Sequence, residues 1–310
     1  MRRFRRRDGL LLAALAMLGG SAWSKPARRF GKAELDARYA AALPAPAGPM
    51  RVFQLGHSLV GRDMPAMLQQ LAGPGHLYDS QLGWGATLKA HWGDAPIPGF
   101  AQENAHPRYR DAAEAIDSGD LDAFVLTEMV EIRDAIRYYD SGDYVALWAA
   151  RAWEANPATR VYLYETWPAL DDPDGWLSRL DTDPDLYWEG DILRRALAAD
   201  DRHRPIYVIP AGTVLARFVR EVQARGGVDG LARPQDLFAD TIHPNDLGAY
   251  LVALTHYAVL YQRSPVGLPH QLLRADGSPA LAPGPAAARL MQQIVWEVVT
   301  HSPKTGMPQG

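Results

Sequence analysis

Five short apolar segments constrain the fold of this chain more than any other feature. They occupy residues 50–55, 77–82, 123–127, 160–164 and 205–209. Runs of this length, bounded by glycine or polar residues, indicate buried strands. Because stretches with helical spacing of apolar residues separate them, we expect a parallel sheet covered by helices on both faces.

Helical spacing predicts the elements that cover this sheet. The expected helices span residues 64–71, 144–155, 192–199, 214–224, 245–261 and 286–299. Without an internal repeat or a linker, residues 50–310 are predicted to form one domain. Two long loops, 83–120 and 165–190, are rich in Trp, Pro, Gly and Asp. Such loops either carry substrate recognition or elaborate the surface.

The N-terminus has the pattern of a targeting segment. Arginines precede an uncharged apolar stretch at 9–18, and Ala22 and Ser24 suit a cleavage site. This order predicts a secretory signal peptide over residues 1–24 and a periplasmic or secreted protein. Arg6-Arg7 also fits twin-arginine export, and an uncleaved membrane anchor is the alternative. Residues 25–49 are Ala- and Pro-rich and form a leader with a short helix around residues 33–42.

Composition narrows the classes of partner. The 310 residues are 47% hydrophobic and 22% charged, an ordinary globular balance, and include no cysteine. Disulfides, a cysteine nucleophile and thiolate metal sites are therefore excluded. The chain has a formal charge of −4, and residues 1–24 carry five Arg and one Asp, so the remainder is near −8. An acidic protein of this kind is a poor partner for nucleic acid, and no apolar run after residue 24 predicts membrane insertion.

A serine follows the first predicted strand directly. Gly56-His57-Ser58 lies where that strand ends, and open α/β sheets bind ligands at the carboxyl ends of their strands. Gly56 permits a tight turn and close approach of a substrate to the backbone. The motif therefore indicates either a nucleophile at Ser58 or a structural turn.

A second motif could supply the base that a serine nucleophile needs. Asp240 precedes His243 by three residues, before the helix expected from Asn245. On one loop, the carboxylate could hold one imidazole nitrogen while the other faces Ser58. Alternatively, Asp240 and Asn245 serve as turn or capping residues, and His243 simply packs at the surface.

Together, GHSLV at 56–60 and DTIHPNDLGAYLVA at 240–253 resemble the SGNH/GDSL hydrolase superfamily over about residues 50–262. The resemblance implies a flavodoxin-like three-layer α/β/α sandwich with a central five-stranded parallel sheet. It implies that Ser58 is the nucleophile, His243 the general base and then acid, and Asp240 the orienting carboxylate. It implies no cofactor and no metal.

The oxyanion-binding motifs of that family are less well matched. The resemblance assigns oxyanion donors to the N–H groups of Ser58 and Gly85, with Gly83 the next choice. The family's third motif contributes an asparagine, but this chain has Leu-Thr-Glu-Met-Val-Glu at 126–131. Losing one such donor costs about 3–4 kcal/mol of transition-state stabilisation. The chain thus resembles a divergent bacterial branch without this asparagine.

Four further side chains are predicted to bind substrate: His57, His91, Glu128 and Trp167. Glu128 could contact hydroxyls or, kept protonated by burial, donate to the oxyanion; otherwise it pairs with Lys89 or an arginine. Trp167 could stack on a sugar or pack in the core. His91 could line the pocket or lie on a helix face packed against the sheet.

The resulting prediction is an exported serine esterase that removes a small acyl group, such as O-acetyl, from a carbohydrate through an acyl-enzyme. An O-acyltransferase with the same triad and a non-catalytic glycan-binding protein are the alternatives. A third class is a metal site, with nitrogen and oxygen ligands drawn from His57, His91, Glu128, Asp240 and His243. None of their spacings is a metal signature. The sequence does not indicate the oligomeric state.

Overall fold

The computed structural model describes residues 28–93 and 96–308, and its centre is one parallel sheet. The strand order is β2-β1-β3-β4-β5. The strands are β1 (Arg51–His57), β2 (Leu77–Gly83), β3 (Ala123–Leu126), β4 (Arg160–Glu165) and β5 (Tyr207–Pro210). All five predicted strands are therefore confirmed. This is the doubly wound order of flavodoxin-like proteins, in which ligands bind beside the first strand.

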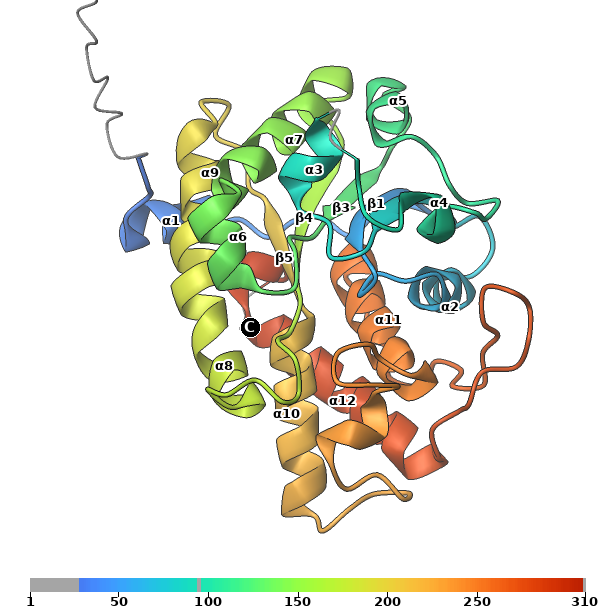
Figure 1. Cartoon of the computed structure of the whole chain (residues 1–310). Coiled ribbons are helices and arrows are strands. Elements are labelled where there is room, and N and C mark those ends of the chain that lie inside the picture. Colours follow the sequence, from blue (N-terminus) through green and yellow to red (C-terminus); the bar gives the residue numbers. More distant parts are fainter. Residues whose placement is uncertain (1–27, 94–95, 309–310) are drawn as a thin grey trace, which may run out of the picture.

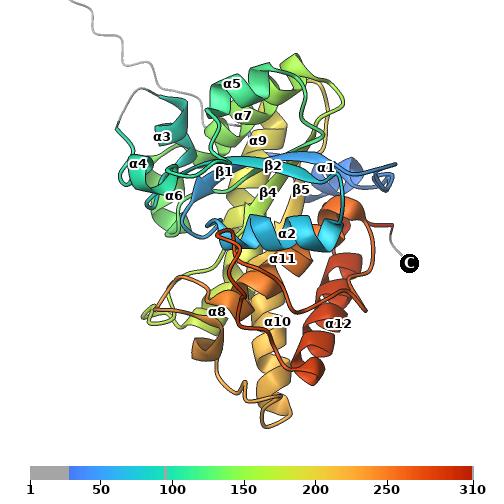
Figure 2. The same cartoon turned by 90° about the vertical axis from the view of Figure 1, so that its right-hand side faces the viewer.

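Helices cover both faces of the sheet, which confirms the three-layer sandwich (Figures 1 and 2). One layer contains α2 (Asp63–Ala72), α10 (Ala211–Ala224), α11 (Asp246–Tyr261) and α12 (Pro285–His301). The opposite layer contains α5 (Ala112–Asp117), α7 (Ser141–Ala155) and α9 (Arg194–Ala199). Each predicted helix corresponds to one of these elements.

Helix α11 explains the long apolar run that follows the histidine motif. It packs against α2 on one side, α12 on another and the sheet beneath, so it is apolar around its whole circumference. Leu251 and Leu254 are completely buried. Each such side chain contributes about 1.5–3 kcal/mol by leaving water. The start of α11 is thereby fixed against the sheet.

Short helices interrupt both long segments predicted as loops. The first contains α3 (Leu88–Trp92), α4 (Phe100–Glu103) and α5, and the second contains α8 (Trp176–Asp183) and the start of a π-helix, η1 (Pro184–Leu193). The structure adds α6 (Ile132–Tyr138) and two 3-10 turns, η2 (Pro234–Leu237) and η3 (Pro303–Thr305). The helices α3, α4 and α6 and the 3-10 turns are too short for their apolar periodicity to be evident in the sequence. By contrast, α8, η1 and α9 form one continuous helical stretch from Trp176 to Ala199, so the prediction of a loop over 165–190 is wrong for most of its length. The π-helix breaks the 3.6-residue period on which the prediction depends.

The described part of the leader, from residue 28, joins the core. It contains α1 (Lys32–Arg38), whose Leu35 is completely buried, and Tyr39 donates to the carbonyl of Ile206 at 2.5 Å. The predicted signal peptide, 1–24, lies outside the described residues. None of the helices in the described part of the chain combines the length and apolar character that a membrane span requires.

Candidate active site

The fold places Ser58 at the carboxyl edge of the sheet, one residue beyond β1. Gly56 is required here because a Cβ at this position would lie 2.5 Å from Thr127 Cγ2 and 3.2 Å from Val60 Cγ2. His57 pairs with Gly83 in the register of β1 and β2. Ser58 and the turn containing Gly85 therefore leave adjacent strands side by side.

Ser58, His243 and Asp240 form a continuous hydrogen-bonded chain. His243 Nε2 lies 2.9 Å from Ser58 Oγ, and His243 Nδ1 lies 2.8 Å from Asp240 Oδ2. Because a carboxylate can only accept, Nδ1 donates to Asp240, and Nε2 is left to accept the proton of Ser58. The predicted nucleophile, base and orienting carboxylate are thus brought together with the required polarity.

Backbone donors hold the Asp240 carboxylate in place. Its Oδ1 accepts from the N–H of Ile242 at 2.8 Å and from that of His243 at 2.7 Å. These bonds, with the imidazole contact, lower the pKa of Asp240 to about 2. The side chains of His243 and Asp240 are 42% and 54% exposed, so the site is open to solvent.

Trp167 supports the loop that carries Asp240 and His243, between η2 and α11 (the histidine loop). Its Nε1 donates to the carbonyl of Ile242 at 2.9 Å, and the N–H of Leu170 donates to that of Thr241 at 2.7 Å. Trp167 is 1% exposed and packs edge-on against Tyr164 and Phe238. The prediction that Trp167 is a sugar-stacking platform is therefore wrong, because its ring is enclosed in the core.

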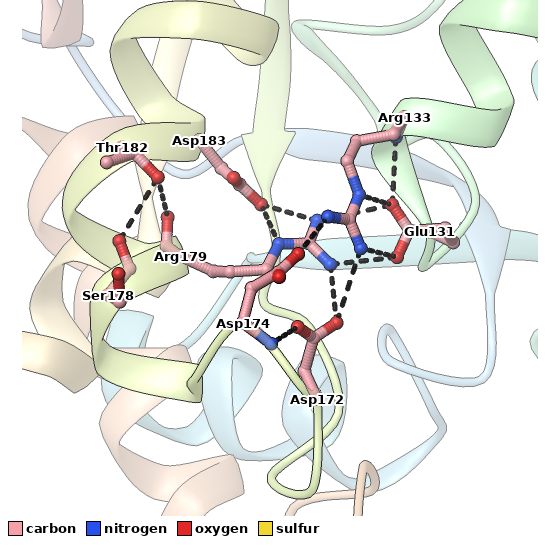
Figure 3. Close-up of polar contacts among 8 residues, drawn as sticks. All are labelled: Glu131, Arg133, Asp172, Asp174, Ser178, Arg179, Thr182 and Asp183. Carbon is pink, nitrogen blue, oxygen red and sulfur yellow. Dashed lines mark hydrogen bonds and ion pairs between the residues drawn. The ribbon is translucent and has the colours of Figure 1, made fainter.

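A buried ion cluster anchors the segment that carries Trp167 and Leu170 (Figure 3). Arg179, which is 3% exposed, contacts Asp172 at 2.7 Å, Asp183 at 2.6 Å and Glu131 at 2.8 Å. Arg133 joins the cluster through Glu131. The two guanidinium groups lower the pKa of Glu131 to about 2, against the opposing effect of its burial. This cluster ties the ends of β3 and β4 together behind the histidine loop.

Two backbone N–H groups are available as oxyanion donors. Within the described residues, neither the N–H of Ser58 nor that of Gly85 has a protein acceptor. Gly85 has φ of +55°, a left-handed conformation that glycine adopts without strain, and it is exposed. Both predicted donors are thus free at the ends of adjacent strands, whereas Gly83 is buried at the end of β2.

His57 and His91 lie beneath the site rather than in it. His57 is 0% exposed; its Nε2 donates to the carbonyl of Glu128 at 2.7 Å and its Nδ1 accepts from Leu59 N–H at 3.3 Å. His91 is 7% exposed, and Nε2 donates to the Gly56 carbonyl at 2.8 Å. Burial lowers the pKa of both rings to about 4. The prediction that they contact substrate is wrong, because both are enclosed and hydrogen-bonded.

Glu128 lies in the segment after β3 where the resemblance would place an asparagine, but its side chain points inward. It is 0% exposed, and Oε1 accepts from the N–H of Leu88 at 3.3 Å and of Met129 at 2.8 Å. Burial raises its pKa to about 7. It contacts neither solvent nor Lys89, which instead pairs with Asp140. Both the predicted substrate contact and the ion pair with Lys89 are therefore corrected: Glu128 fixes the start of α3.

The cleft over the triad reveals residues that sequence reasoning missed. It has a volume of about 360 Å³ and is lined by Ser58, His243 and two arginines, Arg62 and Arg274. Arg62 precedes α2, whereas Arg274 comes from the segment between α11 and α12, which returns across α2 (Figure 2). Arg62 could have been predicted to line the cleft because it lies four residues after Ser58 in the sequence. No sequence motif near Arg274 indicated that it lines the cleft.

The structure does not assemble the alternative metal site. Within residues 28–93 and 96–308, no three His, Asp or Glu side chains are grouped closely enough to hold an ion. His57, His91 and Glu128 are engaged below the surface, while Asp240 and His243 engage each other above it. The arrangement is that of a serine–histidine–aspartate site.

The fold and this site define an α/β protein with a triad at the carboxyl edge of its parallel sheet. No family model matches the sequence, and no curated protein matches it. Among solved structures, the chain is similar to a DUF4886 family protein from Bacteroides uniformis, with 15% identity and a TM-score of 0.53. That match covers 82% of this chain and 95% of the other, and establishes a shared fold.

Two other solved structures align with a smaller share of the chain. One is a member of the lipolytic protein G-D-S-L family from Veillonella parvula, with 17% identity and a TM-score of 0.38 over 69% of this chain and 100% of that one. The other is a carbohydrate esterase family 3 protein from Talaromyces cellulolyticus, with 12% identity and a TM-score of 0.39 over 69% and 97% of the two chains. Likenesses this distant concern the fold alone.

Proposed function

We propose that this protein is an exported serine esterase of the SGNH type that removes a small acyl group from a carbohydrate. The observation that carries the proposal is the polarity of the chain from Ser58 through His243 to Asp240. Because its Nδ1 donates to a carboxylate, His243 can accept the serine proton at Nε2, and the charge of the resulting imidazolium is balanced.

In this mechanism, Ser58 Oγ attacks the ester carbonyl while its proton passes to His243 Nε2. Asp240 stabilises the imidazolium that forms. The tetrahedral oxyanion accepts from the N–H groups of Ser58 and Gly85. His243 then protonates the departing alkoxide, which leaves an acyl-serine. Water, deprotonated by His243, hydrolyses this intermediate and restores the free serine.

The missing asparagine predicts a slow enzyme. Glu128 points away from the site, so two backbone donors serve where the family has three. The loss of one donor lowers kcat by about 10²–10³-fold. Esters with good leaving groups, such as aryl acetates, are therefore the first substrates to screen, because their hydrolysis remains detectable with a slow enzyme.

The first experiment is the intact mass of the protein after treatment with a fluorophosphonate. Wild type is expected to gain one phosphonyl group, whereas Ser58→Ala gains none. Absence of an adduct on both would contradict an activated serine. The glycan-binding alternative instead predicts saccharide binding that survives Ser58→Ala without any turnover. A transferase would be revealed by acyl transfer to an added alcohol in competition with water.

The same masses test export. A chain produced with its N-terminus in a bacterial host is expected to be found in the periplasm or medium, shortened by the mass of residues 1–24. Recovery of the full-length chain from the cytosol would contradict the signal peptide.

A further inference from the structure

A second cavity adjoins the triad cleft. It has a volume of about 360 Å³ and shares Gly61, Arg62 and Arg274 with the cleft that contains Ser58. Because these residues line both spaces, a ligand whose ester lies at Ser58 can extend across them into the second cavity.

The lining of this cavity is basic. It includes Arg62, Arg108 and Arg274, and no carboxylate. Arg274 is paired with Asp246 at 2.6 Å. Among the described residues, neither Arg62 nor Arg108 forms an ion pair: Arg62 donates to the carbonyls of Gln102 and Glu103. Two guanidinium groups thus line a cavity that has no carboxylate in its wall, in a protein of net negative charge. The acidic side chains of Asp63 and Asp79 lie outside the lining but close enough to interact electrostatically with Tyr78.

Arg108 is held against the side chain of Tyr78. Its guanidinium lies 5.0 Å from the ring centre of Tyr78, stacked in a cation–π contact. Its backbone N–H donates to His106 Nδ1 at 3.1 Å. This bond leaves the imidazole proton on Nε2, which has no acceptor within the described part of the chain. The cavity therefore carries donors in excess of acceptors.

Ser80 adds a hydroxyl to the wall of this cavity. The residue is 2% exposed and lines the cavity, and no hydrogen bond joins its hydroxyl to another described residue. A hydroxyl that borders a cavity in this way can donate a hydrogen bond to a ligand there. The acidic residues of the adjoining cleft are already engaged, since Asp63 accepts from Ala275 N–H and Asp246 from Arg274.

We propose that this cavity binds an anionic group of the substrate, a carboxylate or sulfate on the saccharide that bears the scissile ester. The inference rests on the proposed esterase function and deepens it, from a carbohydrate ester to an acidic carbohydrate ester. Planar guanidinium groups match carboxylate and sulfate oxygens with paired donors, and the free hydroxyl of Ser80 adds another.

The test compares matched acidic and neutral esters. An O-acetylated oligogalacturonide is assayed beside the same oligomer with its carboxylates reduced to hydroxymethyl groups, and beside a sulfated neutral oligomer. We expect wild type to prefer the acidic esters in kcat/KM by about tenfold or more, the size of one charge-assisted hydrogen bond. Arg108→Gln is expected to remove most of this preference. Arg220→Gln, which alters an exposed arginine paired with Asp181, is the control expected to keep it.

A binding measurement separates this proposal from the esterase proposal. Calorimetric titration of Ser58→Ala with the deacetylated oligogalacturonide and with its reduced form needs no turnover. Binding that favours the acidic oligomer, weakens with added salt and is lost in the Ser58→Ala/Arg108→Gln double variant supports the anion site even if no ester is hydrolysed. Equal binding and equal hydrolysis of acidic and neutral oligomers by wild type would overturn it. The sulfated arm identifies which anion fits better.

Discussion

Three histidines lie near Ser58, and the contrast between His243 and the pair His57 and His91 separates chemistry from support. His243 is partly exposed, and its Nδ1 partner is the Asp240 carboxylate. The other two are buried, and each donates through Nε2 to a backbone carbonyl, of Glu128 or Gly56. A neutral carbonyl cannot balance an imidazolium as a carboxylate does.

The difference shows how one residue type acquires opposite roles at one sheet edge. His57 and His91 each satisfy one donor and one acceptor, which fixes them as neutral rings. His57 ties the end of β1 to the chain after β3, and His91 ties α3 to β1. Of these three histidines, His243 is the one with a ring nitrogen directed at a hydroxyl that can give up its proton. The buried layer holds the strands in register, and the exposed loop carries the reaction.

The comparison is tested most severely by His243→Ala. Because no other imidazole reaches Ser58 Oγ, we expect kcat for an aryl acetate to fall by at least about 10⁴-fold. The side chain is partly exposed, so the melting temperature is expected to change little. Steady-state hydrolysis and a thermal melt of both proteins measure this. Activity near that of wild type would place the base elsewhere.

Asp240→Asn probes the partner that distinguishes His243 from the buried pair. The amide would keep Oδ1 as an acceptor for the backbone but present an N–H to His243 Nδ1. The imidazole would then carry its proton on Nε2, facing Ser58 in the wrong tautomer. We expect kcat to fall by about 10³–10⁴-fold with the fold intact. If the rate were unchanged, the carboxylate would have no part in the reaction.

The strands and the triad were predictable because their signals are local. Five apolar runs gave the sheet, and two short motifs contained Ser58, Asp240 and His243. The roles of His57, His91 and Trp167 were not predictable, because the burial of these side chains depends on α3 and on the segment between β4 and α8, which fold over them. Arg274 reaches the cleft only through the path of the chain after α11. Sequence periodicity identifies a buried face, but not which polar side chains a distant segment will cover.

His91→Leu sharpens the comparison from the buried side. Removing the ring leaves the Gly56 carbonyl and the Gln81 amide without their partner. We expect a loss of about 2–4 kcal/mol of unfolding free energy, the cost of two unpaired buried groups. Denaturant titration at neutral pH measures it. The control is His301→Leu, at an exposed histidine on α12, which is expected to lower the unfolding free energy far less.

The smallest effect concerns Glu128, the carboxylate of the buried layer. Its pKa of about 7 lies above the ordinary value of 4.5, so folding favours its protonated form. Its contribution to stability is therefore complete below about pH 4.5 and is lost as the pH rises through about 7. The side chain of Glu128→Gln does not titrate, and its amide can donate to the buried hydroxyl of Ser141, which interacts with the Glu128 carboxyl in the wild type.

The unfolding free energy of the variant should therefore increase relative to that of wild type as the pH rises. The difference in unfolding free energy is expected to shift by about 1–3 kcal/mol in favour of Glu128→Gln between pH 5 and pH 8. The buried histidines titrate in both proteins and cancel in this difference. Denaturant titrations at the two pH values measure it. A difference that stays constant with pH would mean that Glu128 ionises at its ordinary pKa, and that the layer beneath the triad is wetter than its 0% exposure indicates.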